Sequence, residues 1–560
     1  MKILIQIFKA FSRKELLVFT AAFLIFTLSF IFIAVDFFNK KTVLKPISGG
    51  EYIEGVVGQP SFINPIIVGN NDAARDLTEL LFSNLSDLSE SKKISEDGKI
   101  WNIRLKENIF WQDNQPIISD DIIFTIRIIQ DPDSRSPLFS YWQGVLAERI
   151  SERELKLTLS EPYAFFESAI KELRPIPKHL FENIPAANLR LSEYNLEPIA
   201  NGPFKFLSFE KDRSGFIKEY HLVVSENYFG KKPYLKNFVF KYYQNEDELL
   251  KAFNSGAIDG FGGLSSKNLS RININHQIFE LRSPKYYAVF LNSTAQPALK
   301  DKNVRLALNY ATDKKSLIKK IFEGRALPVY GPLVLGMKGF VNFGAEGYSE
   351  ENFSLEKAGQ ILEAGGWRLN EDGVREKKSK KESQRLEFDL AVPQISFLTE
   401  TAELIKEDWS KIGVKLNLIV RSPSEINEEI IKTRNYKMLL FGNVFSNTDS
   451  PDLSSFWHSS ERFYPGLNLS LYENKTADAL IESIRRNLNE KSRQRDLTAL
   501  QSLIINDLPV IFLYSPNYLY ITKPFLGGFD SSTAEHEISL PSDRFKDVEN
   551  WYIKTAKVFK

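Results

Sequence analysis

Side chains suited to catalysis or metal binding occur in this chain, but none of them stands in a recognised motif. No histidine has a partner at metal-ligand spacing, and no H-E-x-x-H sequence occurs. The absence of cysteine excludes thiolate metal sites and a cysteine nucleophile. Neither a G-x-x-x-x-G-K-S/T phosphate loop nor a G-x-S-x-G nucleophile elbow is found. We therefore expect no metal, no cofactor and no enzymatic activity, although plentiful carboxylates leave a hydrolytic acid pair open as an alternative.

Length and charge narrow the class of protein further. The chain has 560 residues, with 72 Lys+Arg against 71 Asp+Glu and a net charge of +1. This balance argues against a nucleic-acid partner, because such proteins normally carry a basic excess. At roughly 100–200 residues per domain, several domains are expected. The hydrophobic fraction of 43% is enough for packed cores and excludes a disordered chain.

A membrane anchor is predicted near the start of the sequence. Residues 16–35 form an uncharged, mostly apolar run, which as a helix would be about 30 Å long and would span the hydrocarbon core of a bilayer. Basic residues flank it on both sides and only weakly favour an inside N-terminus. We expect residues 1–15 in the cytoplasm, a linker over 36–50, and the rest outside the cytoplasm, in the periplasm or at the cell surface. A cleaved signal peptide is the alternative.

Strand and helix patterns alternate along the rest of the chain, as they do in α/β layers. Residues 238–243 are a predicted strand, with alternate aromatic side chains on one face. A helix with an acidic first turn follows at Glu246 and ends near Gly256. Residues 301–324 predict two successive helices, the second capped by Asp313. These elements are the frame that must position any binding side chains.

Six segments, in the same order along the chain, resemble the family 5 extracellular solute-binding proteins, which are the oligopeptide- and dipeptide-binding components of ABC importers. Each segment is a weak signal by itself, and the shared order over some 500 residues makes the resemblance specific. The segments are EGVVGQPSFINPI (54–66), DGKIWNIRLKENIFWQDNQPIISDDIIFTI (97–126), NGPFKF (201–206), VRLALNYATDKKSL (304–317), AGQILEAGGW (358–367) and LPVIFLYSPNYLYITKPFLGGF (508–529).

The resemblance implies an α/β fold of the type II periplasmic-binding-protein kind, with two lobes that close on a ligand by hinge motion. Lobe one would carry an inserted subdomain, and a single transmembrane helix would precede the whole. The implied divisions are 51–82, 196–284 and 514–560 for the core of lobe one, 83–195 for the inserted subdomain, and 285–513 for lobe two.

The resemblance also assigns candidate ligand-binding residues on both sides of the cleft. Arg434 matches a basic cleft residue, and residues 442–452 match the loop that reads the ligand. Where the resemblance implies an aspartate for the peptide's free amino group, this chain has Asn447, which favours longer or blocked peptides, or another solute, over short free peptides. The full candidate set is Gly69, Asn70, Asn71, Tyr141, Trp142, Arg434, Asn447, Asp449 and Trp457.

Local structural roles remain open for several of these residues. Tyr141 and Trp142 could pack inside the subdomain, Trp457 could belong to the core of lobe two, and Asp449 could only form a turn. The expected function is capture of a peptide or peptide-like solute by a monomer, followed by delivery to an ABC permease. A sensor of the same fold, or a hydrolase acting in the cleft, are the alternatives.

Overall fold

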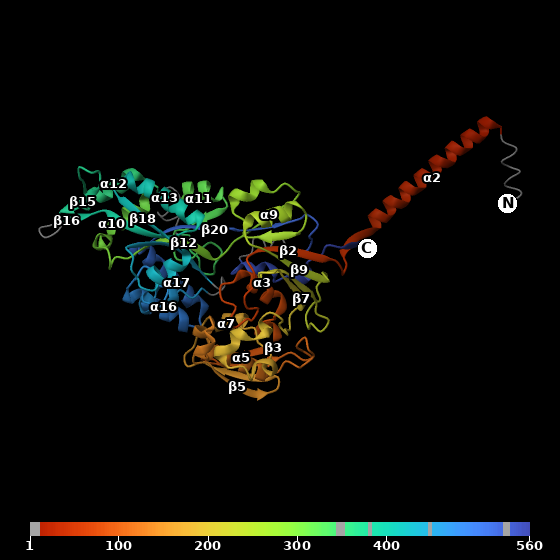
Figure 1. The fold of residues 1–560 in the computed structure, drawn as a ribbon, viewed down its shortest axis with the longest axis horizontal. Coiled ribbons are helices and arrows are strands. Elements are labelled where there is room, and N and C mark those ends of the chain that lie inside the picture. Colours follow the sequence, from red (N-terminus) through yellow and green to blue (C-terminus); the bar gives the residue numbers. More distant parts are fainter. Residues whose placement is uncertain (1–11, 343–352, 379–382, 446–450, 530–537, 560) are drawn as a thin grey trace.

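The computed structural model of the protein describes residues 12–342, 353–378, 383–445, 451–529 and 538–559. Its first helix, α2 (Arg13–Lys41), projects away from a folded body (Figure 1). Ser12 and Glu15 form a capping box at its start. In the described part of the chain, α2 is the one helix long and apolar enough to cross a membrane, and a signal sequence would have the same features.

The segment expected to be a linker is ordered instead. Strand β1 (Thr42–Pro46) follows α2 directly and pairs antiparallel with β22 (Thr555–Phe559). Gly50, with φ +91°, then lies so close to Ile553 that an added Cβ would come within 2.4 Å of its side chain. The prediction missed this strand because its partner, β22, lies some 500 residues further along the chain, and a local sequence pattern does not reveal such a distant pairing.

Lobe one is built on a seven-stranded mixed sheet with the order β11-β21-β10-β2-β9-β8-β7. The predicted strand at 238–243 is confirmed as β9, and the helix after it is α9 (Glu246–Asn254), capped by Asn245. Helix α3 (Asp72–Leu81) also belongs to this lobe. The strands are β2 (Glu51–Val57), β7 (Phe204–Lys211), β8 (Ile217–Val224), β9 (Asn237–Tyr243), β10 (Gly260–Gly262), β11 (Gln277–Leu281) and β21 (Tyr518–Thr522).

A four-stranded antiparallel sheet, ordered β3-β4-β6-β5, forms a separate subdomain below lobe one in Figure 1. Its apolar core includes Trp101, Trp111, Trp142 and Phe166. The elements are α4 (Leu85–Leu88), β3 (Ser89–Ile94), β4 (Ile100–Leu105), α5 (Ser119–Gln130), α6 (Phe139–Trp142), β5 (Leu146–Ser151), β6 (Glu154–Thr158), α7 (Phe166–Glu172) and α8 (Lys178–Phe181).

Lobe two is built on a six-stranded mixed sheet with the order β13-β20-β12-β19-β17-β18. The strands are β12 (Lys285–Leu291), β13 (Ala326–Pro328), β17 (Glu387–Pro393), β18 (Lys415–Arg421), β19 (Met438–Val444) and β20 (Val510–Pro516). A small sheet of β14 (Arg368–Leu369), β15 (Arg375–Lys378) and β16 (Ser383–Arg385) lies at the end of the molecule furthest from α2 (Figure 1).

Helices pack on both faces of the six-stranded sheet and create two apolar cores. The two predicted successive helices are present, and Asp313 caps the second of them as expected. The helices are α10 (Lys302–Tyr310), α11 (Lys314–Phe322), α12 (Leu355–Ala364), α13 (Ser396–Ser410), α14 (Pro423–Glu425), α15 (Ser454–Trp457), α16 (Lys475–Arg486) and α17 (Glu490–Asp507).

Two short connections join the large sheets. Strand β11 of lobe one leads into β12 of lobe two through residues 282–284, and β20 returns to β21 through Asn517. Asn517 donates a 3.0 Å hydrogen bond from Nδ2 to Glu280, which also pairs with Arg325 of lobe two. Because few residues lie between the sheets, relative motion of the lobes would be concentrated there.

Candidate functional site

A large cavity of about 1120 Å³ lies where lobe one, the subdomain and lobe two meet. Val68, Gly69 and Arg75 line it from the loop and helix at the start of α3. Tyr141 lines it from the subdomain, and Gly336 lines it from lobe two. Segments far apart in the sequence thus build one chamber, as a cleft between lobes requires.

The polar lining of this cavity carries charges of both signs. Arg174 forms an ion pair with Glu79, and both side chains are largely buried. Burial raises the pKa of Glu79, while the nearby Arg174 opposes that shift. At another part of the cavity wall, the Lys546 Nζ atom lies 3.1 Å from Asp543 Oδ2. The chamber therefore presents charges of both signs, including two ion pairs, rather than a field of one sign.

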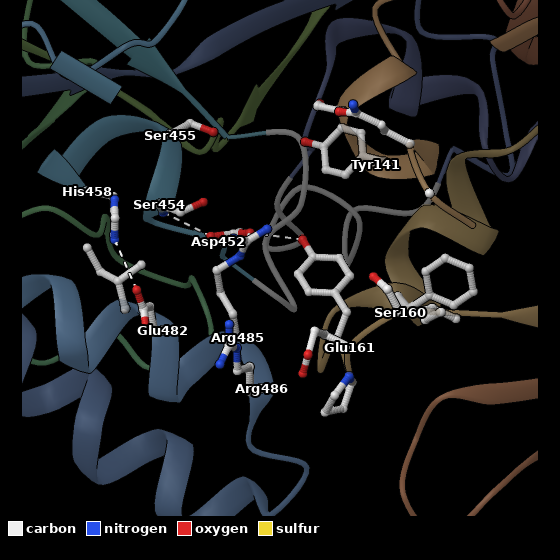
Figure 2. A pocket seen from close by; sticks show the side chains of 18 of the residues that line it. Tyr141, Ser160, Glu161, Asp452, Ser454, Ser455, His458, Glu482, Arg485 and Arg486 are labelled. Atoms are coloured by element: carbon white, nitrogen blue, oxygen red, sulfur yellow. Dashed lines mark hydrogen bonds and ion pairs between the residues drawn. The ribbon is translucent and has the colours of Figure 1, made fainter. Parts of the chain in front are cut away.

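A second cavity, of about 520 Å³, lies between the subdomain and lobe two (Figure 2). Tyr141, Ser160 and Glu161 line it on the subdomain side, and Asp452 and Glu482 line it on the other. Tyr141 lines both cavities, so the two are neighbours within one interlobe cleft. We call this second space the rim cavity.

Direct contacts join the two sides at the rim cavity. The Tyr163 hydroxyl donates to Asp452 Oδ2 at 2.9 Å, and Arg485 Nε donates to the same oxygen at 3.0 Å. The Ala164 backbone N–H donates to the Arg485 carbonyl at 2.7 Å. Phe165 enters an apolar core of lobe two. We call the contacts of Tyr163, Ala164 and Phe165 with lobe two the clasp.

The clasp favours a protonated tyrosine. Burial raises the pKa of Tyr163 well above its ordinary value, and the negative charge of Asp452 raises it further. The hydroxyl therefore stays a hydrogen-bond donor across the physiological pH range. Since the Arg485 guanidinium also lies 5.2 Å from the centre of the Tyr163 ring, one lobe-two cation contacts both partners of the bond.

Among the sequence-predicted site residues, Gly69, Asn70, Asn71 and Tyr141 lie at or beside the large cavity. Gly69 lines it with φ +57°, and Tyr141 lines both cavities. Asn71 caps α3 by accepting from the Ala74 N–H at 2.7 Å. Asn70 accepts from Arg75, itself a lining residue, at 3.0 Å. The structure therefore gives the two asparagines a role in shaping this wall.

Three other predicted residues are buried and line neither cavity. Trp142 packs edge-on against Phe166 in the subdomain core. Trp457 packs against aromatic rings in the core of lobe two. Arg434 donates its guanidinium N–H groups to three backbone carbonyls of lobe two. Each of these side chains is committed to packing or to a loop, so its contact with a ligand stays a prediction.

Asn447 and Asp449 lie outside the described residues. Sequence reasoning did not single out Tyr163 or Arg485. Tyr163 and Asp452 are 289 positions apart, so no spacing motif could have joined them. In the described part of the chain, no group of three or more His, Asp or Glu side chains could hold a metal ion.

Comparison with known proteins identifies the fold and the family. A sequence profile of the bacterial extracellular solute-binding proteins, family 5, matches residues 86–464. The oligopeptide-binding protein AppA of Bacillus subtilis is 26% identical over 535 residues, which cover 92% of this chain and 93% of that protein. The nickel-binding periplasmic protein of Escherichia coli is 26% identical over 485 residues, covering 82% and 86%.

Solved structures share the fold. The structure of B. subtilis AppA in complex with a nonapeptide superposes with a TM-score of 0.71 at 24% identity, covering 91% of this chain and all of that one (100%). The substrate-binding protein CtaP of Listeria monocytogenes gives a TM-score of 0.76 at 24% identity, covering 90% and 100%. The predicted α/β two-lobed fold is confirmed, and this chain belongs to the bacterial extracellular solute-binding proteins of family 5.

Proposed function

We propose that this protein is a membrane-anchored receptor that captures a peptide or peptide-like solute between its lobes and delivers it to an ABC transporter. The observation that carries the proposal is the interlobe cleft, whose large cavity is lined from lobe one, the subdomain and lobe two. A ligand that fills the cavity can contact lobe one, the subdomain and Gly336 of lobe two. Its binding energy therefore depends on how the lobes sit relative to one another.

Lobe closure then follows from differential affinity. A shift from about 1:99 to 99:1 in favour of the closed form requires roughly 5.5 kcal/mol more binding energy in that form. The clasp contributes to closure in the absence of a ligand, because it joins the subdomain to lobe two directly. The backbone bond of the clasp is worth about 1 kcal/mol, and the bond from Tyr163 to the charged Asp452 about 1.5–3 kcal/mol. These bonds by themselves fall short of about 5.5 kcal/mol, so the ligand must supply differential binding energy.

The size and chemistry of the cleft favour a peptide over a metal ion. The large cavity, about 1120 Å³, exceeds the usual range of roughly 300–1,000 Å³ for small-molecule pockets. Its paired charges suit a chain with polar main-chain groups and ends of both signs. B. subtilis AppA, which shares the fold, was solved with a nonapeptide.

Helix α2 would tether the body to the membrane, with the body outside the cytoplasm. Its apolar run has the length of a bilayer core, and none of its residues is buried by the rest of the protein. A tethered receptor stays at a high effective concentration near its permease, so weak docking is enough for delivery.

The test uses the full chain purified in detergent and incubated with a mixed peptide library. Mass spectrometry of the retained fraction should recover intact peptides. Tyr141→Ala should reduce retention, because Tyr141 lines both cavities, whereas Tyr464→Ala on the exposed surface of lobe two should not. Thermal melting checks that both variants fold.

Other outcomes separate the alternatives. Steady cleavage of the library, abolished by a single carboxylate substitution, would identify a hydrolase. Absence of any retained solute would contradict the proposal. Peptide uptake by cells that lack the protein separates an importer component, whose loss reduces uptake, from a sensor, whose loss does not.

A further inference from the structure

The two-stranded ribbon between α2 and the body leaves apolar side chains largely exposed to solvent. Among the described residues, strands β1 and β22 form a two-stranded sheet of their own. Leu44 is 65% exposed and Phe559 is 63% exposed. An isolated two-stranded ribbon is at best marginally stable in water. We therefore expect the exposed apolar side chains of this ribbon to pack against another surface.

The register of the ribbon places apolar and basic side chains together. In an antiparallel pair, opposed residues share a face, so Phe559 lies with Thr42 and Lys557 lies with Leu44. The face is amphipathic, because Lys557 shares it with Leu44 and Phe559. Other lysines lie at the end of α2, on the opposite face of β1 and just before β22. They are Lys40, Lys41, Lys45 and Lys554, and the acid Asp36 near the end of α2 pairs with Lys40.

Helix α2 fixes the height of this ribbon. If residues 16–35 fill the hydrocarbon core, Phe38 lies about 4.5 Å beyond its edge, at 1.5 Å per residue. The polar interfacial layer extends roughly 5–8 Å on each side of that core. Phe559 packs edge-on against Phe38, with ring centres 5.6 Å apart. Phe559 is therefore held at the level of the lipid headgroups.

The connection to the body is stiff rather than loose. The Ile47 N–H donates to the Lys554 carbonyl at 3.1 Å, and the Gly49 N–H donates to the Tyr234 carbonyl at 2.7 Å. Lys557 donates to Asn39 at the end of α2. Figure 1 shows the last residues of the chain beside the base of α2. The ribbon thus joins helix and body as one piece.

We propose that the β1–β22 ribbon is a membrane-docking collar that lies in the headgroup layer of the bilayer spanned by α2. Leu44 and Phe559 enter the boundary between headgroups and acyl chains, and the lysines bind anionic headgroups. The collar fixes the orientation of the binding protein above the membrane. This inference rests on the proposed anchoring by α2, and its test separates the two.

The experiment uses single-cysteine variants of the full chain, which has no natural cysteine. The variants Phe559→Cys and Leu44→Cys carry a spin label in vesicles of phosphatidylethanolamine and anionic phosphatidylglycerol. Phe26→Cys, within α2, reports whether the helix is in lipid. Leu369→Cys, on an exposed strand of lobe two, is the aqueous control. Accessibility to lipid-soluble oxygen is compared with accessibility to a water-soluble nickel complex.

We expect the oxygen-to-nickel accessibility ratio at positions 559 and 44 to exceed that at 369 several-fold and to lie below that at 26. Adding Phe559→Ser to the chain labelled at position 44 should lower the ratio there, whereas adding Leu369→Ser should not. Removing phosphatidylglycerol should lower the ratio at both ribbon positions.

Each contrary outcome has a distinct meaning. Lipid exposure at 26 with aqueous exposure at 559 and 44 would overturn the collar and leave the anchor intact. Protection of 559 and 44 from both reagents would show burial against protein, for example a second copy, and would also overturn the collar. Aqueous exposure at 26 would overturn the anchoring and the collar together.

Discussion

A buried basic side chain in each lobe has a different kind of partner. In lobe one, Arg544 donates to Asp76 with both terminal guanidinium nitrogens, at 2.9 and 2.6 Å, and to Glu54 at 2.9 Å. In lobe two, Lys314 is buried without a carboxylate, and it donates to the Val329 carbonyl at 3.0 Å beneath the Tyr330 ring. The buried lobe-one arginine thus has two buried carboxylates as partners, whereas the buried lobe-two lysine has a backbone carbonyl and an aromatic ring.

The difference follows the way each lobe is assembled from the chain. Lobe two takes all six strands of its main sheet from one stretch, residues 285–516. Lobe one joins β2, α3, β21 and the turn at Arg544, which are widely separated in sequence, and its ionic cluster contacts all four. We interpret the cluster as a set of interactions that form only when these distant segments are correctly packed together. Some buried polar groups are known to favour one specific arrangement in this way.

The largest expected effect comes from removing the central cation. Arg544→Met should leave Glu54 and Asp76 buried and unpaired, which costs about 3–5 kcal/mol. Hydrogen-exchange mass spectrometry should show lost protection in β2 and α3 and little change in lobe two. Arg385→Met, an exposed arginine of lobe two, is the matched control. An equal loss of hydrogen-exchange protection in both lobes would contradict a role of Arg544 specific to lobe one.

A pH effect of on the order of 1–3 kcal/mol is expected next, because one pKa unit corresponds to about 1.4 kcal/mol. Burial raises the pKa of Glu54 to about 7 and that of Asp76 to about 6, against the opposing effect of Arg544. A carboxyl group with a raised pKa binds more protons when folded, so stability falls as pH rises from about 4.5 to about 7. Lobe one should therefore be more stable at pH 6 than at pH 8.

Glu54→Gln isolates the Glu54 contribution, since the amide does not titrate. The protection of β2 and α3, corrected for the intrinsic pH dependence of exchange, should then vary less between pH 6 and pH 8 than in the natural chain. The Glu54 carboxylate faces Arg544, Asp76, Tyr52 and Tyr520. An unchanged pH profile would show that Glu54 does not titrate in this range.

The contact between the two lobes should be weaker than the cluster inside lobe one, because the Arg485 side chain of the clasp is about half exposed. Tyr163→Phe removes one hydrogen bond to a charged carboxylate, worth about 1.5–3 kcal/mol. The open population should rise about 10- to 160-fold by the same energy. Energy transfer between dyes at Ile150→Cys and Leu369→Cys measures it, with Tyr464→Phe as control. If the distribution of distances between the two dyes is the same in Tyr163→Phe as in the natural chain, the clasp has no role in closure.

The smallest effect is expected in lobe two. Lys314→Met keeps similar volume and should change stability by less than about 1 kcal/mol at pH 7, because it removes the cost of burying the amine together with a single hydrogen bond worth about 1 kcal/mol. Burial lowers the pKa of Lys314 to about 7. The unfolded chain therefore binds more protons above pH 7, and natural lobe two gains stability as pH rises. The free energy of unfolding of Lys314→Met, relative to that of the natural chain, should therefore be lower at pH 9 than at pH 7. The reverse trend would contradict a buried neutral amine.

Local sequence signals predicted individual elements well where short-range physics sets them. The alternating aromatic residues of 238–243 gave a strand, and Asp313 capped its helix, because side-chain periodicity and capping act within a few residues. The order of six short segments was enough to predict the two-lobed fold. The family resemblance assigned Gly69 and Tyr141 to the cleft, and both line the large cavity, while their contact with a ligand stays a prediction.

Tertiary structure alone decided which residues meet. Sequence could not distinguish Trp142, buried in a core, from its neighbour Tyr141 at the cavities, because both are aromatic and adjacent. It could not join Tyr163 to Asp452, nor β1 to β22, since pairs separated by hundreds of residues carry no local pattern. The sequence thus determined the elements and their order, whereas long-range packing placed the clasp and the ribbon.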